Sequence, residues 1–338
     1  MRADAPPTSY AQLTAAAADQ LRCDLARRDQ LSMRQRRAVD GVAHALRRGS
    51  MNRAIPARHL LYLDLQAPTP AAAIAVGDLD TATHIVWHLS GVGIRPDTAM
   101  WGTVREAGQV VLELQRVGRD LPAPVRPACI AWLGYTPPVL FESLFAARAR
   151  AAVPRIAADM RQLLRLRPDG PHVAIEGHSY GGSVAAHFLE ALAEHPPRRL
   201  WGLRKTSDDV AHLAARCAGR QEPLMDAFVM LGSPGIPTRF GRDPELLGLP
   251  VAHVYDAVAS SDWIARGGRL IGKLLGNRGP LGSRLPVDAL PAQGLLPVTG
   301  HNSSHFVPGR SQTLFGYRDA GTRSLRNIAR IITGQEPL

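Results

Sequence analysis

A five-residue turn near the middle of the chain, Gly177-His178-Ser179-Tyr180-Gly181, constrains the fold more than any other feature. Residues 172–176 before it are apolar and partly β-branched, which predicts a strand, and residues 182–193 after it are rich in Ala, Leu and Phe, which predicts a helix. Strand and helix backbones approach closely at so short a turn, so small residues are needed at both of its ends. The central serine is then held in a strained backbone conformation, with its hydroxyl raised above the sheet edge.

This turn fits the G-x-S-x-G pattern of a nucleophile elbow, and Ser179 is the candidate nucleophile. The bare pattern also occurs by chance, as a glycine-rich turn with an incidental serine. The strand before the turn and the helix after it favour the elbow, because that context is what the motif requires.

Strands and helices alternate along most of the chain. Strands are predicted at 60–65, 72–76, 84–89, 128–133, 172–176, 227–231 and 251–255. Helices are predicted at 97–116, 182–193, 210–218 and 325–332, one or two helices within 140–166, and a helix at 263–275 that is interrupted at Gly267-Gly268. The first two strands are separated by a proline-rich turn and are expected to form an antiparallel hairpin. The alternation that follows indicates an α/β protein with a mostly parallel central sheet and helices on both faces.

The region before the first strand differs in pattern. Residues 8–48 have an incomplete helical stripe of apolar residues that ends at Gly49-Ser50, which predicts a helical hairpin. We therefore expect an N-terminal helical extension over residues 1–55 and a catalytic domain over residues 56–338. Residues 195–225 are polar and are interpreted as an insertion in that domain.

The net charge of +11 comes almost entirely from arginine, since the only lysines are Lys205 and Lys273. One dense group lies in the N-terminal region: Arg22, Arg27, Arg28, Arg34, Arg36, Arg37, Arg47 and Arg48. Such a group could bind nucleic acid or an acidic membrane surface. No aromatic platform or nucleic-acid motif accompanies it, which favours a solvated helix face, and we expect no nucleic-acid partner.

No cofactor or metal site is predicted. The three cysteines, Cys23, Cys129 and Cys217, are far apart, odd in number and without a C-x-x-C pair, which argues against a disulfide framework and a zinc site. His84 and His88 share a predicted strand, where their spacing of about 13 Å is too wide for one ion. No run of about 18 apolar residues and no apolar signal core is present, so a cytoplasmic protein without a membrane span is expected. A search for apolar segments would not detect a secretion signal that consists of helices and is not cleaved.

A serine nucleophile needs a histidine to accept its proton and a carboxylate to orient that histidine. After an elbow, the chain order is serine, acid, histidine. Asp256 and Asp262 both follow the strand predicted to end at residue 255. We favour Asp262, because an acid in a loop can reach across the sheet edge, although an Asp at this position could simply cap the next helix. Asp256 remains the alternative acid.

Only two histidines follow Asp262, namely His301 and His305. Both lie in a loop after the last predicted strand, where a base is expected. We favour His301, which follows Gly300, over His305, which lies beside Phe306 and could pack against it. Either could instead be a structural loop histidine.

The oxyanion hole of such a site uses two backbone N–H groups. One belongs to the residue after the nucleophile, Tyr180. The second is expected in the loop after the third strand, at Gly91 or Val92, although that segment could equally be a plain turn. His178 within the elbow is expected to pack beneath the nucleophile rather than act as the base.

Several further segments resemble one family. They are Leu61-Tyr62-Leu63-Asp64, residues 72–78, Trp132-Leu133-Gly134-Tyr135, the elbow, Gly232-Ser233-Pro234-Gly235, Pro308-Gly309 and residues 324–329. Over roughly residues 55–335 the chain resembles the DUF1023 family of actinobacterial α/β-hydrolases. The resemblance implies an α/β-hydrolase fold with a serine triad and supports Ser179 and Asp262. Members often carry His-Ser-x-Tyr in the last loop, whereas this chain has His301-Asn302-Ser303-Ser304-His305, so the choice of base stays open.

These features predict a serine hydrolase that cleaves a small-molecule carboxylic ester through an acyl-enzyme. An amidase or peptidase would use the same residues. A catalytically silent hydrolase fold that serves as a binding module is a further alternative, because fold alone does not establish activity. The complete order of serine, acid and histidine argues against that alternative.

Overall fold

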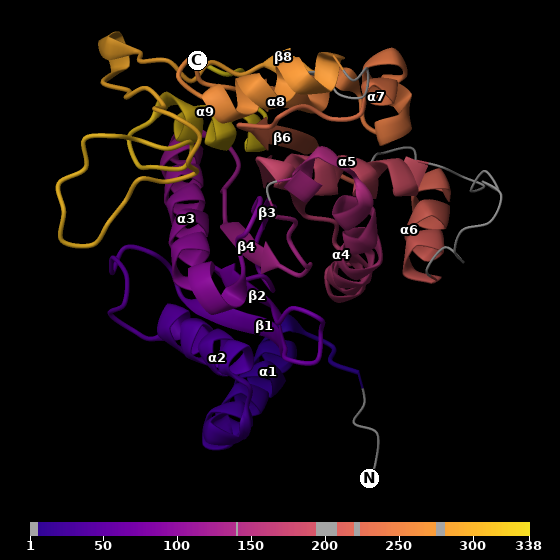
Figure 1. Cartoon of the computed structure of the whole chain (residues 1–338), viewed down its shortest axis with the longest axis vertical. Helices are drawn as coiled ribbons and strands as arrows, with labels where there is room; N and C mark the ends of the chain where they lie inside the picture. Colours follow the sequence, from indigo (N-terminus) through magenta and orange to yellow (C-terminus); the bar gives the residue numbers. More distant parts are fainter. Residues whose placement is uncertain (1–5, 140, 194–207, 220–223, 275–280) are drawn as a thin grey trace.

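The computed structural model describes residues 6–139, 141–193, 208–219, 224–274 and 281–338 (Figure 1). Its strands form one eight-stranded sheet in the order β1-β2-β4-β3-β5-β6-β7-β8. The strands are β1 (Arg58–Asp64), β2 (Ala71–Val76), β3 (His84–Leu89), β4 (Pro127–Leu133), β5 (His172–His178), β6 (Ala227–Leu231), β7 (Val254–Ala257) and β8 (Ser283–Arg284). Only β2 runs antiparallel to its neighbours, and the remaining pairs are parallel. The predicted hairpin and the mostly parallel sheet are confirmed.

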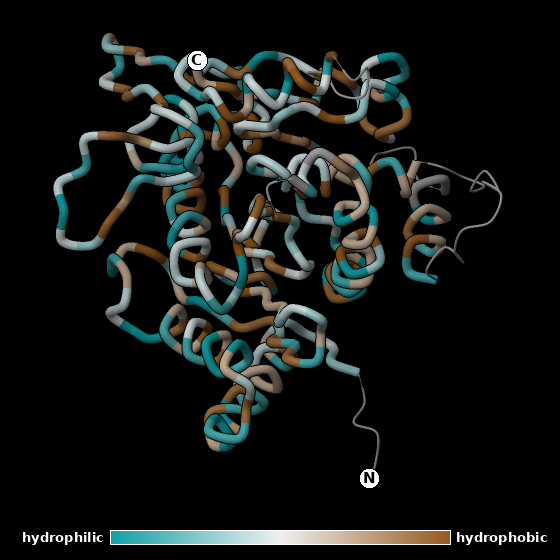
Figure 2. Tube along the Cα trace, viewed as in Figure 1, coloured by the Kyte–Doolittle hydropathy of each residue, from teal (hydrophilic) through white to brown (hydrophobic). Residues whose placement is uncertain are grey.

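Helices cover both faces of this sheet (Figure 1). They are α1 (Tyr10–Ala26), α2 (Met33–Leu46), α3 (Pro96–Val117), α4 (Ala147–Leu166), α5 (Tyr180–Ala193), α6 (Asp208–Gly219), α7 (Thr238–Arg242), α8 (Trp263–Leu274) and α9 (Arg323–Ile332). Alternate strand residues face opposite sides, so Trp87 packs with residues of α4 and α5, whereas Val86 packs with residues of α2, α3 and α9. In Figure 2 the helices change between hydrophilic and hydrophobic colours along each turn, as expected for helices with one face against a sheet.

The N-terminal helices pack on this core. Val39 and Val42 of α2 are fully buried in the same hydrophobic cluster as α3. Ser32 begins α2 with a capping box, in which its side chain accepts from the Gln35 N–H and the Gln35 side chain accepts from the Ser32 N–H. Whether residues 1–55 form a separate unit stays a prediction.

Part of the N-terminal arginine group is neutralised within the helices that carry it. Arg27 pairs with Asp24 at 2.6 Å, and Arg28 pairs with Asp40 at 2.6 Å. Arg22 pairs with Asp19 in the same helix. The Arg22–Asp19 and Arg28–Asp40 pairs lie on solvated surfaces, whereas the Asp24 carboxylate that pairs with Arg27 is buried.

Several details of the chain differ from the sequence-based expectations, and α7 matches no predicted helix. The predicted strand at 251–255 begins later, because Pro250 leads into a 3₁₀ turn at Val251–His253, and Asp256 therefore lies inside β7 rather than after it. The short strand β8 was not predicted, since it lies in a segment rich in Gly and Pro. Of the insertion predicted at 195–225, residues 195–207 and 220–223 lie outside the described residues, and α6 accounts for most of the rest.

Candidate active site

The turn between β5 and α5 places Ser179 at the centre of the site. Ser179 has a φ of +55°, and it is the only non-glycine residue with positive φ in the described part of the chain. This left-handed conformation costs about 1–3 kcal/mol for a residue with a side chain. A Cβ on Gly177 would lie 2.4 Å from the carbonyl carbon of Gly181, so glycine is required there. The strained turn predicted from the motif is present.

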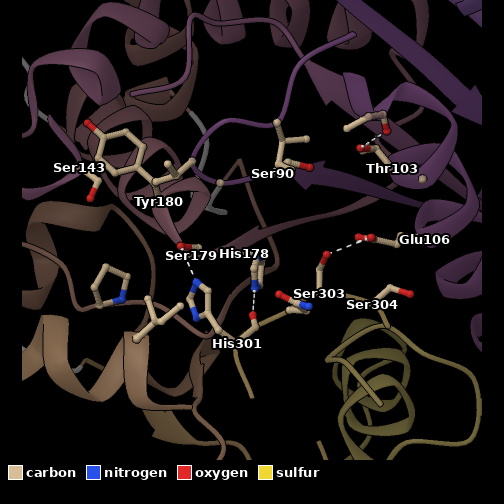
Figure 3. Close-up of a pocket in the computed structure, with 18 of the residues that line it drawn as sticks. Ser90, Thr103, Glu106, Ser143, His178, Ser179, Tyr180, His301, Ser303 and Ser304 are labelled. Atoms are coloured by element: carbon tan, nitrogen blue, oxygen red, sulfur yellow. Dashed lines mark hydrogen bonds between the residues drawn. The ribbon is translucent and has the colours of Figure 1, made fainter. Parts of the chain in front are cut away.

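His301 lies between Ser179 and Asp262. Its Nε2 is 3.0 Å from the Ser179 Oγ (Figure 3). Its Nδ1 is 3.0 Å and 3.1 Å from the two carboxylate oxygens of Asp262. In this arrangement Nδ1–H donates to Asp262, and Nε2 is free to accept the Ser179 proton. Three segments far apart in sequence thus converge on one hydrogen-bonded chain.

The two alternative residues lie elsewhere. His305 Nε2 donates to the Thr299 carbonyl at 3.0 Å, and its backbone N–H donates to Asp319. Asp256 forms an ion pair with Arg269 at 2.6 Å. The structure therefore brings Ser179, Asp262 and His301 together, and it engages His305 and Asp256 in other contacts.

Asp262 has two further contacts, which hold its carboxylate in place. Oδ1 accepts from the Ala265 N–H at 2.8 Å, which caps the start of α8, and Oδ2 accepts from the Tyr317 hydroxyl at 2.7 Å. Burial by itself raises the pKa of Asp262, but the hydrogen bonds from His301, Ala265 and Tyr317 bring that pKa below its usual range. The helix-cap role that the sequence left open is thus combined with the contact to His301.

Tyr317 was not identified from the sequence. It lies 16 residues after His301, outside any motif spacing, and its hydroxyl oxygen also accepts from the Ala259 N–H at 3.0 Å. These two bonds tie the Asp262 carboxylate to the loop that precedes α8.

His178 lines the cavity beside Ser179 and contacts the backbone of His301. Its Nε2–H donates to the carbonyl oxygen of His301 at 2.7 Å (Figure 3). Burial, and then the positive charge of Arg318 and the proximity of His301, lower the pKa of His178 to about 3. A neutral His178 therefore holds the backbone of His301 in place.

The two segments expected to supply oxyanion N–H groups flank Ser179. Tyr180 is the first residue of α5, and its hydroxyl donates to the Phe145 carbonyl at 2.7 Å. A Cβ on Gly91 would lie 2.8 Å from the Ser179 Cβ, so the loop after β3 passes directly against the nucleophile. Val92 lines the same cavity as Ser179. The role of these backbone groups in an oxyanion hole stays a prediction.

A group of buried charged side chains lies next to the site and was not predicted. His88 on β3 and Glu176 on β5 are register partners, and His88 Nδ1 is 2.6 Å from Glu176. Arg318 contacts Glu176 at 3.1 Å and Glu106 on α3 at 3.3 Å. Burial alone raises the pKa of Glu106, but His88, Arg318 and Ser303 bring that pKa down to about 2. The signal available in the sequence was a histidine and a glutamate inside two predicted strands.

These charges also hold the loop that carries His301. The Ser303 hydroxyl donates to Glu106 at 2.9 Å, and the Ser304 hydroxyl donates to Asp319. Arg105 on α3 pairs with Asp319 at 3.1 Å. The residues directly after His301 are therefore tied to α3 and to the segment around Arg318.

A cavity of about 990 Å³ opens over Ser179. One part of its wall is polar and includes Thr103, Glu106, Asn302, Ser303 and Ser304 (Figure 3). Another part is apolar and includes Val92, Ile94, Pro234, Ile264 and Ile271. This volume is at the upper end for sites that enclose small ligands. Within the described residues, no cluster of three or more His, Cys, Asp or Glu side chains could hold a metal ion.

The chain was compared with family models, curated proteins and solved structures. Residues 67–196 match the family model Abhydrolase_8, described as an alpha/beta hydrolase, and no curated protein matches the chain. Similar solved structures include esterase B from Lactobacillus rhamnosis, which is 12% identical over 85% of this chain and 87% of that chain, with a TM-score of 0.41. The feruloyl esterase module from Clostridium thermocellum is 10% identical over 76% of this chain and 85% of that chain, with a TM-score of 0.40. The family match and the sheet with its elbow show that this chain has the α/β-hydrolase fold.

Proposed function

We propose that this protein is a serine hydrolase that cleaves carboxylic esters through an acyl-enzyme. Ser179 is the nucleophile, His301 is the general base and acid, and Asp262 orients and stabilises the imidazole. The observation that carries this proposal is the pair of 3.0 Å contacts that join Ser179 Oγ to His301 Nε2 and His301 Nδ1 to Asp262. We also propose that the chain belongs to the DUF1023 family, in keeping with the motifs that resemble it.

The proposed reaction has two stages. His301 removes the Ser179 proton as Oγ attacks the ester carbonyl, and the resulting oxyanion accepts hydrogen bonds from the N–H of Tyr180 and of Gly91 or Val92. His301 then gives the proton to the leaving alcohol as the carbon–oxygen bond breaks. Water attacks the acyl-enzyme with His301 again as base, and the acid and free Ser179 are released.

The surrounding contacts support these roles. The depressed pKa of Asp262 keeps its carboxylate charged, which favours the imidazolium that forms on His301 in both stages. The neutral His178 fixes the His301 backbone without competing for the Ser179 proton. An amide substrate would use the same groups, and turnover of matched ester and amide substrates separates the two possibilities.

The test is labelling with a fluorophosphonate probe together with ester turnover. We expect wild-type protein to label and Ser179→Ala to lose labelling and at least about 10³-fold in kcat, with a melting temperature within a few degrees. His301→Ala should lose a similar factor, because the nucleophile loses its base. His305→Ala is the matched control and should retain most of the activity.

Two results would reject the proposal. One is a folded wild-type protein that neither labels nor turns over any ester. The other is a Ser179→Ala protein with undiminished turnover, which would place the chemistry on another residue.

A further inference from the structure

Helix α8 exposes an unusual amount of apolar surface. Trp263, Leu270 and Leu274 are 73%, 62% and 79% exposed, and Ile264 and Ile271 are 57% and 45% exposed. At 100° per residue, these five side chains fall within one arc of about 120° on the helix. The exposed stripe is therefore continuous along the whole of α8.

The opposite face of α8 is anchored to the protein. Ala265 and Gly272 are buried, and a Cβ on Gly268 would lie 2.5 Å from the Cβ of Pro234. Arg269 donates to the Ser233 carbonyl at 3.0 Å and pairs with Asp256. The helix runs without interruption through Gly267-Gly268, where the sequence predicted a break, because Gly268 allows this close contact. The apolar stripe is thus held outward in a fixed orientation.

The stripe is continuous with the cavity over Ser179. Ile264 and Ile271 line that cavity and are also about half exposed, so they form part of its rim. Ser143 lines the cavity from another wall, and Phe145, two residues further on, is 56% exposed. An apolar molecule lying on α8 would therefore have a direct path to the nucleophile.

The polar residues of α8 carry only positive charge. The helix contains no Asp or Glu, and Arg266 and Lys273 are exposed beside the apolar stripe. The Arg266 guanidinium lies 4.7 Å from the Trp263 ring, and the whole chain carries a net charge of +11. An apolar stripe with Trp and Leu, flanked by basic residues, is typical of helices that lie in a lipid–water interface.

We propose that α8 docks the protein on an anionic lipid surface and that the substrate is a long-chain acyl ester drawn from that surface. This inference rests on the proposed function and names its substrate class. A second copy of the chain is a poorer occupant, because it would bring the same basic residues, Arg266 and Lys273, against their counterparts and would add a second charge of +11. The described residues contain no helix able to span a membrane.

The first experiment measures vesicle binding by flotation, in the Ser179→Ala background so that no lipid is consumed. The vesicles are phosphatidylcholine with phosphatidylglycerol, and phosphatidylcholine alone. We expect binding to the anionic vesicles and a loss of at least about tenfold in Leu270→Ser/Leu274→Ser. The matched control is Leu25→Ser/Met33→Ser, on α1 and α2 at the other end of the molecule, which should bind as the parent does (Figure 1).

Trp263 provides a readout that locates the contact. We expect its fluorescence emission to shift to shorter wavelength on anionic vesicles, because the exposed indole leaves water. Trp263→Phe should abolish the shift while binding is retained. A wild-type shift that persists in Trp263→Phe would place the contact elsewhere and overturn the proposal.

Turnover separates this inference from the proposed function. In Leu270→Ser/Leu274→Ser with Ser179 intact, hydrolysis of a water-soluble short-chain ester should stay within about twofold, whereas hydrolysis of a vesicle-borne long-chain ester should fall about tenfold. Short-chain turnover without vesicle binding, or equal loss on both substrates, would overturn the lipid inference and leave the esterase intact. Concentration-dependent dimers that disappear in the double variant would overturn it in favour of self-association.

Discussion

Two regions beside Ser179 depart from the usual pattern of burial in opposite ways. Next to Glu106, the side chains of His88, Glu176 and Arg318 carry ionisable groups and are fully buried. On α8, large apolar side chains are exposed, with Leu274 at 79%. Both arrangements are costly for a folded protein, the first because ions lose hydration and the second because apolar surface stays in water.

The comparison indicates that folding stability does not explain either region. Elsewhere in the described chain, charges lie mostly at the surface and the strands are apolar, as physical chemistry expects. Departures from local rules are expected at functional sites, and both of these adjoin the same cavity. The buried charges hold the His301 loop, and the exposed apolar helix forms the rim through which a substrate would pass.

The largest expected effect comes from removing the buried cation. Arg318→Leu removes the arginine that pairs with both Glu176 and Glu106, and we expect a loss of about 3–5 kcal/mol in the free energy of unfolding. Urea denaturation measures this loss. The exposed pair Arg22–Asp19 provides the control, since Arg22→Leu should change stability by no more than about 0.5 kcal/mol.

A second substitution checks the cause. Glu176→Gln in the Arg318→Leu background removes one uncompensated charge and should recover part of the lost stability. Further destabilisation by this second change would show that packing of the Arg318 stem, rather than charge, accounts for the loss.

Much of the fold could be predicted from the sequence, because periodicity and turn chemistry act locally. The strand at 227–231 was placed to the residue, and the hairpin of β1 and β2 was recognised from its proline-rich turn. The strand predicted at 251–255 begins three residues later, at Val254, because residues 251–253 form a 3₁₀ turn after Pro250 despite their apolar pattern. Strand β8 has two residues and no pattern of its own, so pairing with β7 alone defines it.

The candidate site likewise contains residues that could be predicted from the sequence and residues that could not. Ser179 follows from a local motif, and Asp262 follows from its place after a predicted strand. His301 follows from chain order, because only two histidines come after Asp262. Tyr317 and Arg318 could not be found, since their partners Asp262 and Glu176 lie 55 and 142 residues away. Contacts at such separations are set by tertiary packing, on which spacing in the sequence carries no information.

An effect of intermediate size is expected at Tyr317. Its hydroxyl donates to Asp262, and Asp262 connects the two regions because it contacts His301 and also caps α8. Tyr317→Phe removes the hydroxyl that donates to Asp262, so we expect kcat to fall about tenfold with KM little changed. One of the bonds that lower the pKa of Asp262 is lost, so this pKa rises toward its usual value. The part of the loss of kcat that comes from protonation of Asp262 should therefore begin at a higher pH than in wild type, as measured by the pH–kcat profile.

Tyr62→Phe is the matched control for this change. The Tyr62 hydroxyl donates to Asp159 at 3.0 Å, a Tyr–Asp bond outside the cavity. Tyr62→Phe should lower the free energy of unfolding by about 1 kcal/mol, as Tyr317→Phe should, but kcat and its pH profile should stay unchanged. Equal losses of kcat in both variants would assign Tyr317 a purely structural role.

The smallest change in stability is expected on α8, in contrast to the large loss expected for Arg318→Leu. Leu274→Ser replaces a side chain that is 79% exposed, so little buried apolar area is lost and the free energy of unfolding should change by no more than about 0.5 kcal/mol. Leu163→Ser on α4, where the leucine is fully buried, should cost at least about 3 kcal/mol in the same urea assay. A large loss in Leu274→Ser would mean that the protein covers this surface itself in solution. The apolar side chains of α8 would then be covered in solution, and the contrast between an exposed apolar helix and a buried charged group would not hold.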